Sequence, residues 1–98
     1  MTDPPRYSIR LSAEADGELR SLRAHIRARI LGAIETHLRF DPASARGKKK
    51  VIVLSDGEEI WQLRVGDHRV FYDVDAEERL VVIKQVRLKG RRTTEEIR

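Results

Sequence analysis

The sequence contains no cysteine among its 98 residues. It therefore offers neither a disulfide framework nor a thiolate metal site, and a reducing setting is expected. No apolar run approaches the length of a membrane-spanning helix. The first residues, MTDPPRYSIRLS, lack the apolar centre of a signal peptide. These absences predict a soluble, cytoplasmic protein that does not act at a membrane.

The motifs of common catalytic and cofactor sites are missing too. The sequence contains no H-E-x-x-H, P-loop, nucleophile elbow or dinucleotide-binding glycine pattern. Its three histidines, His25, His37 and His68, lack the partner spacing of a metal site. We therefore expect no metal and no cofactor.

Charge is abundant by contrast, and it is unevenly placed. Lys and Arg number 20 against 16 Asp and Glu, which gives a net charge of +4. Two stretches concentrate the positive charge, namely Arg46, Lys48, Lys49 and Lys50, and then Lys84, Arg87, Lys89, Arg91 and Arg92. Such clusters create a local field suited to phosphate or to an acidic protein segment. The alternative, which is more common for runs of charged residues, is a solvated surface that binds no partner.

Apolar spacing and turn residues predict a single domain over residues 1–98. Residues 1–5 are expected to be a disordered lead-in and residues 91–98 a flexible or short helical tail. The expected elements between them are a strand at 6–11, a helix after the N-cap Ser12, a break around 23–25, a helix ending before Pro42, a loop at 41–50, a short strand at 51–54 and a last strand at 79–88.

The stretch WQLRVGDHRVFYDVD, residues 61–75, predicts a β-hairpin. Both arms alternate apolar and polar residues, and Gly66-Asp67 suits a two-residue turn in which glycine supplies a positive φ. Counting back from that turn places Arg64 directly opposite Arg69. Two like charges in this position destabilise a sheet unless an anion or an acidic partner lies there.

The order of elements indicates an α+β fold. We expect an N-terminal strand and a two-helix hairpin packed on one face of a small antiparallel meander sheet. Trp61, Leu63, Val70 and Tyr72 would face the helices, because the hairpin register puts them on one side. The uncovered face would carry Gln62, Arg64, Arg69 and Phe71.

The segment LRVGDHRVFY, with the strand and helical hairpin before it and VVIKQVRLKGRR after it, resembles the RelE/ParE superfamily of type II toxin–antitoxin systems. The resemblance extends over nearly the whole chain and implies a RelE/ParE-like toxin domain. In this superfamily, RelE-like toxins cut messenger RNA on the ribosome and ParE-like toxins poison DNA gyrase. The resemblance also implies a cognate antitoxin protein as partner.

The same resemblance implies a set of site residues. Arg69 holds the place of the functional arginine that follows Gly-Asp-x, and Arg64 stands where the nucleases carry a basic residue on the preceding strand. Lys89 completes the predicted catalytic set. Residues predicted to bind RNA or phosphate are Lys48, Lys49, Lys50, Arg87, Arg91, Arg92 and, by stacking on a base, Phe71.

The tail departs from the nuclease pattern. It reads Thr93, Thr94, Glu95 and Glu96 where many of the nucleases have a tyrosine or histidine. The general acid and base are therefore not identified, with Lys84, Lys89, Glu95 and Glu96 as candidates. The leading prediction is a toxin that inhibits translation by ribosome-dependent, metal-independent cleavage of messenger RNA. The alternatives are a ParE-like gyrase inhibitor, which needs no acid or base, and a degenerate member that only binds its antitoxin.

Overall fold

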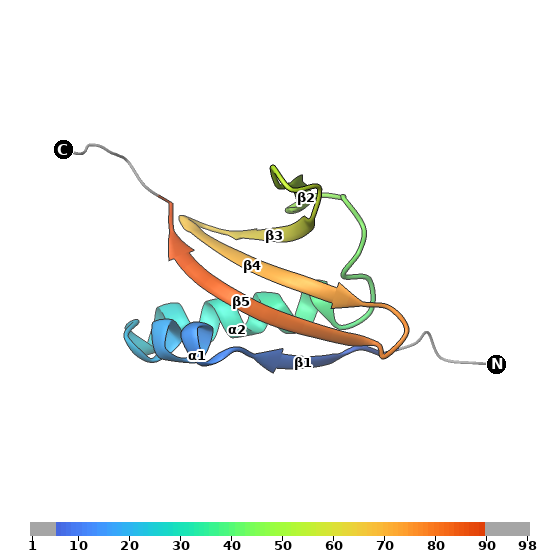
Figure 1. Ribbon diagram of the computed structural model, residues 1–98. Helices are drawn as coiled ribbons and strands as arrows, with labels where there is room; N and C mark the ends of the chain where they lie inside the picture. Colours follow the sequence, from blue (N-terminus) through green and yellow to red (C-terminus); the bar gives the residue numbers. More distant parts are fainter. Residues whose placement is uncertain (1–5, 90–98) are drawn as a thin grey trace.

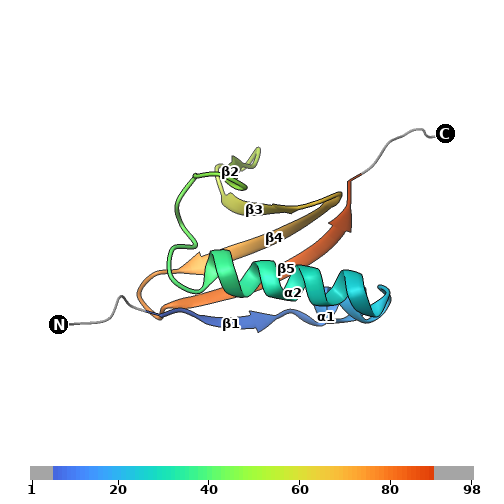
Figure 2. The same cartoon turned by 180° about the vertical axis from the view of Figure 1, so that it is seen from behind.

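The computed structural model describes residues 6–89 and forms one sheet with two helices on one of its faces (Figures 1 and 2). Its elements in chain order are β1 (Ser8–Leu11), α1 (Ala13–Arg20), α2 (Ala24–Leu38), β2 (Lys49–Val53), β3 (Glu59–Val65), β4 (His68–Asp75) and β5 (Leu80–Leu88). The strand order across the sheet is β1-β5-β4-β3-β2. The predicted α+β fold, with a helical hairpin on one face, is confirmed.

The sheet is mixed rather than wholly antiparallel. Strands β2 to β5 form the predicted antiparallel meander, whereas β1 pairs with β5 in parallel. A tight turn forces consecutive strands to run antiparallel, but β1 is separated from β5 by two helices and three strands. β5 therefore lies inside the sheet, in keeping with apolar residues on both of its faces in its first half.

The helices begin close to the predicted places. The Ser12 hydroxyl accepts a hydrogen bond from the backbone N–H of Ala15 at 3.0 Å, so it caps α1 as expected. The break between the helices comprises residues 21–23, slightly before the predicted 23–25. α2 buries a stripe at a spacing of four residues, consisting of Ile30, Ile34 and Leu38.

The hairpin of β3 and β4 has the predicted register. Val65 lies opposite His68, Arg64 opposite Arg69 and Trp61 opposite Tyr72. The φ angle of Gly66 is 58°, a conformation that glycine adopts without the steric cost paid by other residues. The turn chemistry therefore fixes which side chains face the helices and which face away.

β2 begins earlier than predicted. The loop was expected to extend through Lys50, but strand pairing starts with Lys49 opposite Leu63 and Lys50 opposite Gln62. A run of lysines has no apolar alternation to mark the start of a strand, so the boundary depends on the pairing with β3. Because neighbouring residues of a strand point to opposite faces, Lys49 and Lys50 are separated by the sheet.

Within residues 6–89, no helix is both long and apolar enough to cross a membrane. The two predicted terminal segments are a separate matter. The predicted lead-in at 1–5 and the predicted tail at 91–98, with Arg91 and Arg92, lie outside the described residues.

Tyr72 joins the sheet to the segment that follows α2. Its side chain is fully buried, its ring stacks on Trp61 with centroids 6.3 Å apart, and its hydroxyl donates a hydrogen bond to the Pro42 carbonyl at 2.7 Å. Burial, and secondly the negative charge of Asp41, raise the pKa of Tyr72 well above its ordinary value of about 10. The folded protein therefore keeps the Tyr72 proton at a pH where the unfolded chain loses it.

This retained proton predicts an alkaline loss of stability. Below pH 10 both states hold the proton, but above it the unfolded state is favoured by about 1.4 kcal/mol per pH unit. Tyr72→Phe should flatten this slope, while costing about 1 kcal/mol at neutral pH for the lost hydrogen bond to Pro42. Urea unfolding of both proteins across the alkaline range measures the slopes, with Tyr7→Phe as the matched control. Parallel slopes for wild type and Tyr72→Phe would assign the alkaline effect to other groups.

Candidate functional site

Four cations lie side by side across neighbouring strands on the face opposite the helices. Arg64 of β3 lies opposite Arg69 of β4, and Arg69 lies opposite Arg87 of β5. On the other side, the Arg64 backbone N–H donates to the carbonyl of Lys48, just before β2, at 2.9 Å. We call Lys48, Arg64, Arg69 and Arg87 the cationic row. Neighbouring strands are about 5 Å apart, so the row places basic residues at short, regular intervals along the backbone.

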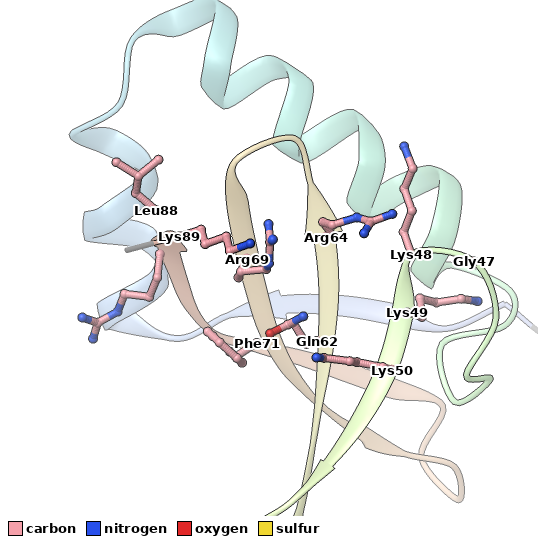
Figure 3. Close-up of a pocket in the computed structure, with 11 residues that line it drawn as sticks. Gly47, Lys48, Lys49, Lys50, Gln62, Arg64, Arg69, Phe71, Leu88 and Lys89 are labelled. Carbon is pink, nitrogen blue, oxygen red and sulfur yellow. The ribbon is translucent and has the colours of Figure 1, made fainter. Parts of the chain in front are cut away.

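The cationic row belongs to an open pocket of about 700 Å³ (Figure 3). The residues that line it are Gly47, Lys48, Lys49, Lys50, Gln62, Arg64, Arg69, Phe71, Arg87, Leu88 and Lys89. The structure thus brings together the predicted catalytic residues Arg64, Arg69 and Lys89 with the predicted phosphate-binding residues of β2 and β5. Arg91 and Arg92 are outside the described residues.

The charges of Arg64 and Arg69 are not neutralised by carboxylates within residues 6–89. The Nη1 atom of Arg69 donates to the carbonyls of Gly66 and His68, at 3.1 and 3.0 Å. These neutral acceptors hold the guanidinium over the hairpin turn without cancelling its charge. Arg64 and Arg69 are like-charged residues at directly opposite positions of the sheet, so an incoming anion would relieve an unfavourable interaction.

Lys89 extends the positive charge beyond β5. Its backbone N–H donates to the Asp67 carbonyl at 2.7 Å, which holds the end of β5 beside the hairpin turn. Figure 3 shows its side chain directed toward Arg69. Lys89 and Arg69 therefore lie together at one end of the pocket, whereas Figure 3 shows the Arg64 side chain directed toward Lys48.

Lys49 is oriented differently from its two neighbours. Its ammonium donates to the backbone carbonyls of Asp41 and, at 3.4 Å, of His37 at the end of α2, and its side chain is only 9% exposed. This placement pins the segment after α2 to the sheet and caps the helix. The structure therefore puts the Lys49 charge on the helix-facing side, whereas Lys48 and Lys50 are exposed at the pocket.

Arg87 is the member of the row that already has acidic partners. Its Nη2 atom lies 2.5 Å from a carboxylate oxygen of Glu14, and its Nε atom lies 3.0 Å from one of Glu18. Glu18 also accepts the backbone N–H of Val86 at 2.6 Å, at an edge of β5 that β1 is too short to cover. Sequence reasoning missed both glutamates, because 73 residues separate Glu14 from Arg87 and no local pattern connects them.

The pocket offers positive charge, one aromatic ring and an amide. Its described lining residues include no carboxylate, histidine or tyrosine. Among residues 6–89 there is also no group of three or more His, Asp or Glu residues that could hold a metal ion. The arrangement suits binding of a polyanion and stabilisation of developing negative charge.

One comparison with known proteins identifies a family, and another identifies solved structures of the same fold. A family model described as the ParE toxin of type II toxin–antitoxin system, parDE, matches residues 9–92. No curated protein matches the chain. The archaeal RelE–RelB complex from Pyrococcus horikoshii OT3 contains a chain of the same fold, with a TM-score of 0.73, 20% identity, and coverage of 89% of this chain and 99% of that one.

Two bacterial structures are similar as well. The RelBE2 toxin–antitoxin complex from Mycobacterium tuberculosis matches with a TM-score of 0.69 and 24% identity, covering 85% of this chain and 98% of that one. The intact RelBE complex from E. coli matches with a TM-score of 0.53 and 23% identity, covering 88% and 99% respectively. Identities at this level establish a common fold.

Proposed function

We propose that this chain, which belongs to the ParE toxin family of type II toxin–antitoxin systems within the RelE/ParE superfamily, inhibits translation by cutting messenger RNA on the ribosome, the activity of the RelE-like branch. The observation that carries this proposal is the cationic row on a sheet face free of helices, beside the ring of Phe71. Guanidinium groups bind phosphate oxygens in pairs, and an aromatic ring stacks on an unpaired base. This activity would take place in the cytoplasm, because translating ribosomes and their messenger RNA are there.

The chemistry needs charge stabilisation and two proton transfers. The RNA 2′-hydroxyl attacks the adjacent phosphorus, the bond to the 5′-oxygen breaks, and negative charge builds on the phosphate oxygens. Arg64 and Arg69 stabilise that charge, and Lys89 donates a proton to the leaving oxygen. Lys48 and Lys50 hold the flanking phosphates. The candidates for the proton acceptor, Glu95 and Glu96, lie outside the described residues.

A second function, inhibition of DNA gyrase, is favoured by the match to the ParE family and by the residues that line the pocket. The described residues that line the pocket include no carboxylate, histidine or tyrosine that could act as a general base. A toxin that binds and blocks an enzyme needs no proton transfer. In that case the cationic row would contact an acidic surface of gyrase.

The proposed partner that restrains either activity is an antitoxin. The three similar structures described above are all toxin–antitoxin complexes. An acidic or amphipathic antitoxin segment laid against the cationic face would neutralise Arg64 and Arg69 and close the pocket. A catalytically degenerate toxin would retain this interaction alone.

Toeprinting of translating ribosomes incubated with the protein tests the proposed function. We expect cuts in the message at the ribosomal A site, with no cleavage of the same message in the absence of ribosomes. A supercoiling assay with purified gyrase is run in parallel. Intact message together with inhibited supercoiling would replace the first proposal with the second, and the absence of both effects would leave only antitoxin binding.

A further inference from the structure

We propose that Gln62 and Phe71 form a subsite that recognises a base of single-stranded RNA, with adenine preferred. This inference rests on the proposed function, because it names what the pocket reads besides phosphate. It assigns a specificity role to a strand residue that the charge pattern does not single out.

The two residues belong to a second row on the pocket face. Lys50 lies opposite Gln62, Gln62 lies opposite Phe71, and Phe71 lies opposite Gln85. Cross-strand neighbours of this kind have Cβ atoms about 5 Å apart and contact each other directly. Figure 3 shows Gln62 between Phe71 and Lys50, with its amide at the pocket. An amide, an aromatic ring and a cation are therefore presented together.

The amide of Gln62 is available to a ligand in the pocket. The side chain is half-buried, yet within the described part of the chain its amide makes no hydrogen bond. The matched residue at the other end of the row behaves differently, since the Gln85 amide donates to Glu14 at 3.2 Å. Because the pocket is open, water can occupy the positions beside the Gln62 amide in the free protein, and a ligand can displace it. A ligand edge with one donor and one acceptor would satisfy both ends of the Gln62 amide.

Phe71 supplies the apolar part of the subsite. Its ring is half-buried and lines the pocket, and it is not part of the hydrophobic core that the helices cover. Part of the ring is therefore presented to the pocket, among the cations that line it. A flat base stacked on it would cover the ring and would place the base edge beside Gln62.

The spacing of the two rows matches the connectivity of a nucleotide. Gln62 precedes Arg64 by two residues and Phe71 follows Arg69 by two, so each pair lies about 6.6 Å apart along its strand. A phosphate on Arg64 and Arg69 would thus leave its own nucleoside over the second row. Adenine is the expected base, because its N6 amino group lies beside an acceptor on two edges, N1 on one and N7 on the other, and glutamine can pair with either edge through two hydrogen bonds.

Binding of short RNAs to the purified full chain tests this subsite without ribosomes or catalysis. The probes are fluorescently labelled hexanucleotides of adenine, cytosine, guanine or uracil. We expect the wild type to bind the adenine RNA about tenfold more tightly than the others, and Gln62→Leu to lose that preference. Phe71→Leu should weaken binding of every RNA about tenfold, because stacking is insensitive to base identity.

Two controls make the result independent of folding effects. Gln85→Leu makes the same chemical change in the same row and should keep the adenine preference, and circular dichroism shows whether each variant is folded. An RNA with purine in place of adenine lacks the 6-amino group, so the wild type should bind it about tenfold more weakly and Gln62→Leu should not distinguish the two. Equal binding of all four RNAs by the wild type would overturn the subsite alone. Binding of none would overturn the subsite as well, and toeprinting would then decide separately whether ribosome-dependent cleavage stands.

Discussion

Replacing Arg69 with alanine is expected to slow ribosome-dependent cleavage of messenger RNA about a hundredfold. Arg69 occupies the centre of the cationic row, with Arg64 opposite it on one side and Arg87 on the other. Arg69 can therefore contact a phosphate that is also bound by Arg64, or one that is also bound by Arg87. Rates of A-site cleavage at saturating protein, measured by toeprinting, give the comparison with the wild type.

The same substitution should leave the stability of the fold within about 0.5 kcal/mol of the wild type. Alanine removes two hydrogen bonds to carbonyls of the hairpin turn, where water can replace the donor, and it also removes repulsion from Arg64. Arg10→Ala on β1 is the matched control, since Arg10 is an exposed arginine that does not line the pocket. A variant at Arg69 that fails to fold would show that the turn hydrogen bonds are structural, and one that folds and cleaves normally would remove Arg69 from the site.

Arg69→Lys separates charge from shape at this position. Lysine retains the positive charge but lacks the planar fork that binds two phosphate oxygens at once. We expect a rate between those of the wild type and Arg69→Ala. A full rate with lysine would mean that the pocket needs only positive charge here.

The hairpin was predictable from the sequence because its determinants are local. Alternation with a period of two assigns the faces, and Gly66 at a positive φ fixes the two-residue turn, so the opposition of Arg64 and Arg69 follows by counting. The helices were predictable for the same reason, from the N-cap at Ser12 and the apolar stripe of α2. Each of these features depends on residues that are close to each other in the sequence.

The parts of the pocket that were not predictable depend on contacts between distant segments. The face occupied by Lys49 follows from its pairing with Leu63 and from carbonyls at the end of α2, none of which the lysine run reveals. Arg87 likewise has the charge expected of a phosphate ligand, but Glu14 and Glu18 share it. A sequence shows which residues are charged, whereas the fold decides which charges remain available.

This distinction sets the expected salt dependence of RNA binding. Lys49 and Arg87 each have carboxylate partners. The other five cations of the pocket have no carboxylate partner among residues 6–89, namely Lys48, Lys50, Arg64, Arg69 and Lys89. Each phosphate contact to a single strand contributes about −0.7 to the slope of log affinity against log salt, which gives about −3.5 for five contacts. Affinity for single-stranded RNA should therefore fall about a hundredfold between about 50 and 200 mM salt.

Single substitutions convert that slope into a test of individual residues. Lys50→Gln should reduce the steepness of the slope by about 0.7, whereas Arg10→Gln, which removes the same charge outside the pocket, should leave it unchanged. Fluorescence anisotropy of a labelled oligonucleotide across a salt series measures all three slopes. A nearly flat dependence in the wild type would mean that the cationic row does not bind the nucleic acid backbone. The row would then be a surface for an acidic protein, which is what inhibition of gyrase requires of it.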